Sequence, residues 1–320
     1  MKKVNYNLIQ ILKYKDISIA LLTIVLLIIF ASINKIFVSK QNIAIILKTL
    51  PELGLMAIGM TMLIISGEFD LSVGSTFALA PYLMAILTEK GGINYLFAFF
   101  GCIIAGIIIG LINGVITTKI GIPSFIATLG TMMAWRGAML LISGGFPQTF
   151  PRDVRLAKVF AGNISGFPVQ FIWFIALAAI LWVILEYCKF GNWTYVTGGN
   201  KDASLALGVP VDLVKTINFM IVGALSAFAG SIQVFRMGSA YSVAGTGMEL
   251  QAIGATVIGG TLLSGGSGTI IGTIMGTIII FSVENILILS RAPAFWFRTF
   301  VGVIIIIAVS AHIIFQGRKR

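Results

Sequence analysis

Carboxylates inside apolar stretches are the side chains of this chain best suited to chemistry. Glu52 follows Pro51 in one such stretch, Glu284 interrupts another, and Asp70 ends a third. A charge in hydrocarbon surroundings is costly, so such a residue normally has a partner or faces a polar solute. We expect Glu52 to pair with Lys48, four residues earlier on one helix face. Hydrogen bonding to a polar solute is the chemistry expected of a wider set, which consists of Asp70, Ser72, Ser75, Asn113, Glu249 and Glu284.

Asp70 also has a structural role open to it. It lies just before a short apolar helix expected to begin near Ser72 to Ser75. An aspartate there can accept hydrogen bonds from the unpaired backbone N–H groups of the first turn. Capping is favoured over direct contact with a solute, and the two roles are compatible because a capped half-helix can present polar backbone groups to a pathway.

The sequence contains no motif for enzymatic catalysis. It has no GxxxxGK[ST] phosphate-binding loop, and the glycine-rich stretch 265–272 lacks the lysine that such a loop needs. His312 is the single histidine, which leaves no Ser/His/Asp set, and no carboxylate cluster has metal-ligand spacing. Cys102 and Cys188 do not imply a disulfide framework. We therefore expect no enzymatic activity, no metal site and no cofactor in this chain.

A polar stretch at residues 198–215 separates two very apolar segments. Asn200 is a good N-cap, Asp202 suits the first turn, and Gly208 followed by Pro210 marks the end of a helix of about two turns. Asp212 is then expected to cap the next helix. The short helix is either an ordinary capped loop helix or a small knob that seats in a groove of another protein. The segment that would make this contact is Asn200, Lys201, Asp202, Ala203, Ser204, Leu205, Ala206, Leu207 and Gly208.

The composition indicates the class of protein and the type of secondary structure that positions these residues. Hydrophobic residues make up 58% of the 320 positions, only 10% are charged, and the mean hydropathy is +1.03, which indicates an integral membrane protein. Continuous apolar runs, such as 17–33, favour helices over barrel strands. The net charge of +11 is spread over short loops and both tails, as positive-inside topology predicts, and does not indicate nucleic-acid binding.

We predict an all-α polytopic membrane protein with one transmembrane domain over residues 1–320. Two of its ten predicted spans are shorter than the roughly 20 residues that a straight span needs, and these are expected to be broken or re-entrant. An even number of spans and basic tails place both termini in the cytoplasm, with the loop 189–214 inside and the loop 143–170 outside. The predicted spans are 17–33 (a retained signal anchor), 43–66, 73–88, 94–116, 122–142, 171–188, 215–235, 252–263, 269–289 and 297–315.

Glycines and a faint internal repeat indicate how the spans pack. Glycines at 106, 110 and 114, and again at 268, 272 and 276, have the four-residue spacing that lets membrane helices approach closely. Gly, Leu, Ser, Gly and Ser at 67, 71, 72, 74 and 75 recur at 259, 263, 264, 266 and 267, and the motif AIGxT appears at 57–61 and 252–256. Both copies lie beside a short span, as in transporters built from two halves around a central site. Parallel and inverted repeats both remain open.

The chain resembles the membrane subunits of bacterial ATP-binding cassette importers for ribose, xylose, arabinose and related sugars. The resemblance rests on GGN at 198–200 with the residues that follow it, on SGEFDLSVGS (66–75), NGVITTKIGIPSFIATLGTM (113–132), GTGMELQAIGATVIGG (245–260) and SGGSGTIIGT (264–273). In related amino-acid permeases the loop around 198–200 reads differently. The motifs occur in the family's order over most of the chain and indicate its sugar branch.

The resemblance implies partners and a location. It implies a bacterial cytoplasmic (inner) membrane, a second permease copy (the same chain or a close paralogue) and an extracytoplasmic sugar-binding protein. It also implies a cytoplasmic ATPase subunit that grips the loop 189–214 and carries the ATP and Mg²⁺. The alternative is an ion-coupled secondary transporter that uses Glu52, Asp70 or Glu284; a membrane scaffold or receptor is disfavoured by the broken helices and buried charge. Signalling furanoses, pentoses, hexoses and polyols all remain open as solutes.

Overall fold

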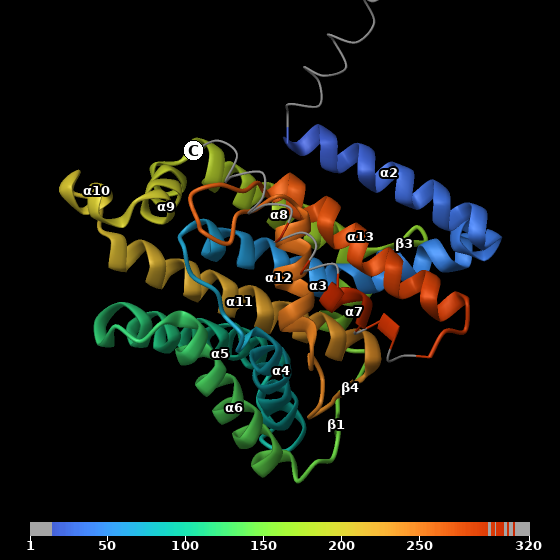
Figure 1. Cartoon of the computed structure of the whole chain (residues 1–320). Helices are drawn as coiled ribbons and strands as arrows, with labels where there is room; N and C mark the ends of the chain where they lie inside the picture. Colours follow the sequence, from blue (N-terminus) through green and yellow to red (C-terminus); the bar gives the residue numbers. More distant parts are fainter. Residues whose placement is uncertain (1–14, 294–295, 298, 304–305, 307–309, 311–320) are drawn as a thin grey trace, which may run out of the picture.

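Helices make up nearly all of the regular structure (Figure 1). The structure is a computed structural model that describes residues 15–293, 296–297, 299–303, 306 and 310. Two-residue antiparallel ladders join β1 (Gln148–Thr149) to β4 (Ser239–Ala240) and β2 (Asn163–Ile164) to β3 (Phe167–Pro168). The helices are α2 (Lys15–Ile33), α3 (Lys40–Ile65), α4 (Val73–Glu89), α5 (Tyr95–Val115), α6 (Ser124–Ser143), α7 (Arg155–Ala161), α8 (Val169–Tyr187), α9 (Lys189–Gly199), α10 (Lys201–Ala206), α11 (Val211–Met237), α12 (Met248–Ile258) and α13 (Ile270–Leu289).

Six of these helices are long and apolar enough to cross a membrane, and the prediction of a polytopic all-α membrane protein is confirmed at that level. Three shorter apolar helices lie within α2, α4 and α12. The count of ten spans is not confirmed, and the tenth predicted span, 297–315, lies largely outside the described residues. The predicted span 252–263 has different bounds, because α12 ends at Ile258, before Gly259 and Gly260. Its 11 residues extend for about 16 Å, roughly half of the hydrocarbon thickness.

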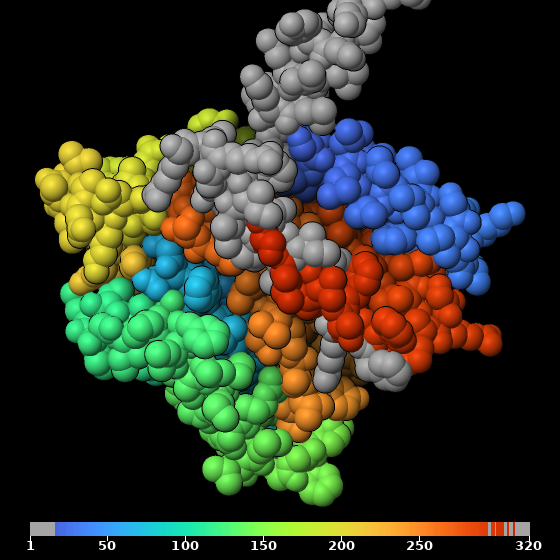
Figure 2. All heavy atoms as spheres, viewed as in Figure 1, coloured from blue at the N-terminus to red at the C-terminus, as the bar shows by residue number. Residues whose placement is uncertain are grey.

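The core of the molecule forms around α3 and α11, whose side chains are mostly buried. Helix α11 packs on α3, α4 and α5, and α13 packs on α2, α3 and α12. By contrast, α2 and α6 lie at the surface in Figures 1 and 2 and expose many large apolar side chains. An apolar exposed helix is the arrangement expected where the surroundings are lipid.

Glycines set the closest helix approaches, as predicted. A Cβ at Gly106, Gly110 or Gly114 of α5 would collide with the backbone of α11. A Cβ at Gly276 of α13 would collide with the backbone of α12, and a Cβ at Gly272 with the carbonyl oxygen of Gly259, directly after α12. In one respect the prediction was wrong. Gly268 precedes α13, in the loop, where it packs against the side chain of Thr261 rather than against another helix.

The 27-residue helix α11 separates two ends of the molecule, about 40 Å apart. Its first residues follow α10, and its last residue precedes Gly238 and β4. β4 pairs with β1, and α7 packs on α11, so the segment 143–170 lies at the β4 end (Figure 1). The structure thus places the two loops predicted on opposite sides of the membrane at opposite ends of one long helix.

The two AIGxT motifs lie side by side in the core. The Thr256 hydroxyl of α12 donates to the carbonyl oxygen of Ala57 in α3 at 3.2 Å, and the hydroxyls of Thr61 and Thr273 are 2.5 Å apart. The AIGxT copies are 195 residues apart and the Gly/Leu/Ser copies 192, so no single register aligns both. The internal repeat therefore stays a prediction.

Candidate functional site

A buried polar cluster begins at the loop between α3 and α4. Asp70 Oδ1 accepts a hydrogen bond from the backbone N–H of Ser72 at 2.6 Å, and Oδ2 accepts from Asn113 Nδ2 of α5 at 2.9 Å. Asn113 Nδ2 also donates to Ser72 Oγ, and Asn113 Oδ1 accepts from the Thr131 hydroxyl of α6. Asp70, Ser72 and Asn113 are at most 1% exposed. Three elements are therefore joined through one carboxylate and one amide.

The capping role predicted for Asp70 takes a modified form. Ser72 occupies the N-cap position of α4, and its own side chain makes no capping bond. Asp70 accepts from the N–H of this N-cap residue, two positions ahead, as in an Asx turn. The Ser75 hydroxyl donates to the carbonyl oxygen of Ser72 at 2.7 Å, inside the helix start. Asp70 thus orients the beginning of α4 from outside the first turn.

Arg136 holds the next part of the site together. Its guanidinium donates to the carbonyl oxygens of Ser242 and Ala244 at 2.9 Å and of Gly74 at 3.2 Å. Backbone carbonyl oxygens, and not a carboxylate, are thus the hydrogen-bond partners of Arg136. Arg136 therefore ties the loop 239–247 to the first turn of α4.

Glu249 lies at the start of α12, directly after the loop 239–247 that Arg136 binds. Both of its carboxylate oxygens accept from the backbone N–H of Gly247 at 3.1 Å. A Cβ at Gly74 would collide with this carboxylate and with the carbonyl oxygen of Gly245, so the starts of α4 and α12 are in close contact. The predicted candidates Asp70, Ser72, Ser75, Asn113 and Glu249 are thus brought to two adjoining helix starts.

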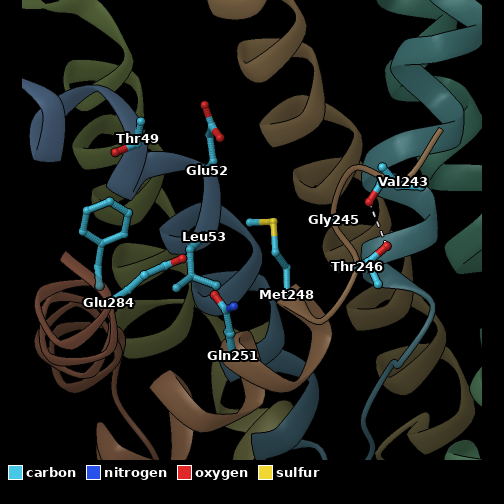
Figure 3. A pocket seen from close by; sticks show the side chains of 10 residues that line it. Thr49, Glu52, Leu53, Val243, Gly245, Thr246, Met248, Gln251 and Glu284 are labelled. Atoms are coloured by element: carbon cyan, nitrogen blue, oxygen red, sulfur yellow. Dashed lines mark hydrogen bonds between the residues drawn. The ribbon is translucent and has the colours of Figure 1, made fainter. Parts of the chain in front are cut away.

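A polar cavity of about 300 Å³ lies between α3, the loop 243–247, α12 and α13. Glu284 of α13 and Gln251 of α12 point toward each other beside Leu53, whereas Glu52 points away from them (Figure 3). Glu284 is separate from the Asp70 cluster and is the predicted candidate that lines the cavity. The remaining lining residues are Thr49, Val243, Gly245, Thr246, Met248 and Phe281.

The predicted partner of Glu52 was wrong. Glu52 Oε1 accepts from Arg236 Nε of α11 at 2.8 Å, and Oε2 accepts from Gln233 at 3.3 Å. The Glu52 side chain is only 6% exposed. The helical spacing of Lys48 and Glu52 permits a pair, but α11 packs along α3 and supplies a cation from 184 positions away in the sequence.

The predicted knob helix is present as α10, at the far end of α11. The Asn200 side chain accepts from the N–H of Ala203 at 3.0 Å, Asp202 lies in the first turn, and Gly208 has φ +76°. Leu205 is 51% and Leu207 79% exposed, and the other exposed members of the segment are Lys201, Asp202, Ala203, Ala206 and Gly208. The Ser204 side chain is turned inward, where its hydroxyl donates to the carbonyl oxygens of Val196 and Asn200. The caps and Ser204 thus fix a short helix with an exposed apolar face.

Asp212 does not cap α11 as predicted. Pro210 occupies the N-cap position, and Asp212 lies in the first turn, where its carboxylate accepts from Lys119 Nζ at 3.0 Å. This pair is exposed on both sides, so it contributes little to stability.

The α10 region contacts both polar loops of the core. Lys215 of α11 pairs with Glu68, which lies two residues before Asp70, at 2.5 Å. A Cβ at Gly198 of α9 would collide with the carbonyl oxygen of Ile65 and with the backbone of Gly266. The Tyr195 hydroxyl donates to the carbonyl oxygen of Gly268 at 2.9 Å. The loops after α3 and after α12 are therefore both fastened to the elements that carry α10.

Sequence reasoning missed the partners of three cations of the site. Arg136, Lys215 and Arg236 each bind a group from a distant part of the chain, and their spacing gives no sign of the partner. One signal was available in the sequence. Arg136 interrupts an apolar run, and a charged residue in such a place is expected to bind a polar group. Among the described residues, no group of three or more His, Cys, Asp or Glu side chains is arranged to hold a metal ion.

Comparison with known proteins identifies the family. Residues 42–309 match the family described as "Branched-chain amino acid transport system / permease component". The chain belongs to this family. Its membership agrees with a helical, multi-pass membrane chain, and the resemblance to the sugar importer permeases is confirmed by the relatives below.

Three similar proteins are permeases of import systems, two for sugars and one for autoinducer 2. The ribose import permease protein RbsC of Bacillus subtilis (strain 168) is 41% identical over 286 residues, which cover 89% of this chain and 88% of the relative. The xylose/arabinose import permease protein XylH of Sulfolobus acidocaldarius is 33% identical over 95% of this chain and 86% of its own. The autoinducer 2 import system permease protein LsrC of Salmonella typhimurium is 35% identical, with coverages of 94% and 85%. No solved structure gives a significant match.

These relatives are permease components and not enzymes. The predicted role of a permease subunit of an importer is confirmed by them over the ion-coupled alternative.

Proposed function

We propose that the chain conducts a monosaccharide or similar small polyol as one of two permease copies in an ATP-binding cassette importer. The relatives, which are import permeases for ribose, for xylose or arabinose, and for autoinducer 2, support this solute class. The second copy is either the same chain or a close paralogue. ATP and Mg²⁺ belong to a separate ATPase subunit, since the sequence has no phosphate-binding loop of its own.

The observation that carries the proposal is the exposed apolar face of α10. Leu205 and Leu207 stand out from a helix whose two ends are fixed, and they are far too few to enter a bilayer. A short rigid knob of this kind suits a groove in a soluble partner. We assign this end to the cytoplasm and to the ATPase, with both termini on the same side.

The opposite end of α11 is assigned to the extracytoplasmic binding protein. The segment 143–170 forms a folded surface there, with α7 and the strands β1 to β3. Arg152 donates to the carbonyl oxygen of Met237 and fastens this surface to the end of α11. A partner that docks on 143–170 is thus connected through α11 to α10.

The contacts of α10 with the core provide a route for coupling. A displacement of α10 moves α9 and the start of α11, which are fastened to the loop after α3 through Glu68 and to the loop after α12 through Gly266 and Gly268. The first loop orients α4 through Asp70, and the second joins α12 to α13. Helices α3 and α4, which the first loop joins, and helices α12 and α13, which the second loop joins, can therefore respond to one partner.

The test is disruption of the knob in reconstituted vesicles that contain the permease, its ATPase and its binding protein. Ala203→Glu or Leu207→Glu forces a carboxylate into the contact, at a desolvation cost of a few kcal/mol, so ATPase recovery with the permease and coupled uptake are expected to fall at least about tenfold. Ile164→Glu is the matched control, since Ile164 is 60% exposed at the other end of the molecule. It should leave ATPase recovery unchanged.

Two results would overturn the proposal. Full ATPase recovery and coupled uptake in both α10 variants would exclude the contact. Uptake of equal rate in vesicles without any ATPase would favour the secondary transporter. Permease abundance in the membrane should stay normal in every variant, because all three residues are exposed.

A further inference from the structure

We propose that the cavity between α3, α12 and α13 is a binding site for a neutral polyhydroxylated solute of monosaccharide size, and that it rejects anionic sugars. Glu284 and Gln251 are its hydrogen-bonding residues. The inference rests on the proposed function and adds to it the place and the selectivity of a solute site.

The charges that line the cavity are the first argument. Its two charged residues are Glu52 and Glu284. Arg236 and Gln233 both donate to the Glu52 carboxylate, and Arg236 balances its charge. Glu284 has no ion pair within the part of the chain that the structure describes. Among the described residues, nothing compensates the negative charge of Glu284 in these partly buried surroundings. A phosphate or carboxylate on the solute would be repelled, and a neutral hydroxyl would be bound.

The hydrogen-bonding capacity of the lining matches hydroxyl groups. An ionised Glu284 only accepts, and the Gln251 amide both donates and accepts, so the pair can bind neighbouring hydroxyls that themselves both donate and accept. The Thr49 hydroxyl donates to the carbonyl oxygen of Ile45 at 2.8 Å, and the Thr246 hydroxyl to that of Val243 at 2.7 Å (Figure 3). Each threonine oxygen keeps its lone pairs for a donor from the solute.

The rest of the lining is apolar and the space is small. Leu53, Met248 and Phe281 provide apolar and aromatic surface for the C–H faces of a sugar ring. A volume of about 300 Å³ is at the lower end of the range for small-molecule sites, about 300–1,000 Å³. An apolar wall with a few convergent polar groups is the usual construction of such a site.

The position of the cavity fits the route of an imported solute. Glu52 is bonded to Arg236, which lies one residue before the end of α11 and thus at the end remote from α10. Gly245 lines the cavity and contacts Gly74 at the start of α4, so the cavity adjoins the Asp70 cluster. A solute released at the 143–170 end would meet this cavity first.

Cysteine labelling of the purified full-length permease in lipid nanodiscs tests the proposal. The exposed Cys188 is replaced by serine, and the buried Cys102 is kept. Val243→Cys, or Met248→Cys if the first variant does not fold, then reports on the cavity, because both residues line it and neither is assigned a hydrogen bond to the solute. A cationic methanethiosulfonate is expected to react roughly tenfold or more faster than an anionic one, after normalisation to their rates with a small free thiol. Addition of Glu284→Gln should reduce this ratio to about one.

Glu89→Gln is the matched control, because Glu89 is an exposed glutamate that does not line the cavity. It should leave the ratio unchanged. Ribose, xylose and arabinose at high millimolar concentration are the solute probes. Slower labelling of the reporter by at least one of them, with no slowing by ribose 5-phosphate, is the expected result.

Equal normalised rates for the two reagents, equal protection by ribose and its phosphate, or no protection by any of the sugars would overturn the inference. The labelling uses neither ATPase nor binding protein. Its failure would therefore leave the contact at α10 intact, and loss of the α10 contact would leave the labelling result intact.

Discussion

Lys215 Nζ of α11 lies 2.5 Å from Glu68 Oε1, and these two residues join the helix that follows α10 to the loop that contains Asp70. Their side chains are 13% and 14% exposed, so both charges are largely removed from water. Removal of one partner leaves the other buried and unpaired, which costs about 3–5 kcal/mol in comparable pairs.

Lys215→Met should therefore lower the thermal stability of the permease and uncouple ATP hydrolysis from uptake. The double variant Lys215→Met with Glu68→Leu should recover most of the stability, because no lone charge remains, without recovering coupling. Unfolding in detergent and ATPase-driven uptake measure the two effects. Recovery of both properties in the double variant would reduce the pair to a purely structural contact.

Asp70 and Asn113 form a second pair whose donors and acceptors are fixed. Each Asp70 oxygen accepts a bond, and the Asn113 oxygen accepts from Thr131. Capping alone predicts that Asp70→Asn keeps most of the transport. The structure changes this expectation, because an asparagine at position 70 would set its NH₂ group against the NH₂ group of Asn113.

Asp70→Asn should accordingly lose about as much activity as Asp70→Ala, and the exchange Asp70→Asn with Asn113→Asp should restore part of it. In the exchanged pair, the carboxylate at 113 accepts from the asparagine at 70 and from Thr131. Uptake by the three variants and the wild type at equal membrane abundance is the measurement. An inactive exchange with an active Asp70→Asn would refute this donor and acceptor assignment.

The sequence predicted those features that depend on local spacing. The caps of α10 at Asn200 and Gly208 depend on neighbouring residues, and the approach at Gly110 follows from a four-residue period. Long-range partners were not predictable, since the choice between Lys48 and Arg236 for Glu52 depends on how α3 packs against α11. For the same reason the three carbonyl oxygens bound by Arg136 could not be inferred, as backbone acceptors leave no trace in residue types.

Close helix packing at Gly272 gives a prediction for folding. A Cβ there would collide with the carbonyl oxygen of Gly259, so Gly272→Ala should cut the amount of folded protein in the membrane several-fold, and Gly272→Leu more severely. Gly130→Ala and Gly137→Ala are controls, because a Cβ at either glycine of α6 meets no atom within 4 Å. Fluorescence-detected size exclusion measures the amount. Normal abundance of Gly272→Leu together with lost uptake would assign this glycine to the pathway instead.

The partner of Glu52 can be decided by comparing two cations. Arg236→Leu leaves a carboxylate that is 6% exposed without its ion pair, so it should destabilise the permease by about 3–5 kcal/mol and lower the temperature of unfolding. Lys48→Met should change stability by no more than about 0.5 kcal/mol, since Lys48 forms none of the ion pairs found in the described part of the chain. Glu52→Gln in the Arg236→Leu background should recover stability, because a neutral amide replaces the unpaired charge and can still bond with Gln233.

The measurement is thermal unfolding of the three variants and the wild type at one detergent concentration. If Lys48→Met destabilised the protein as much as Arg236→Leu, the pair within α3 would exist after all, and the attachment of α11 to α3 at the border of the cavity would have to be explained by packing alone.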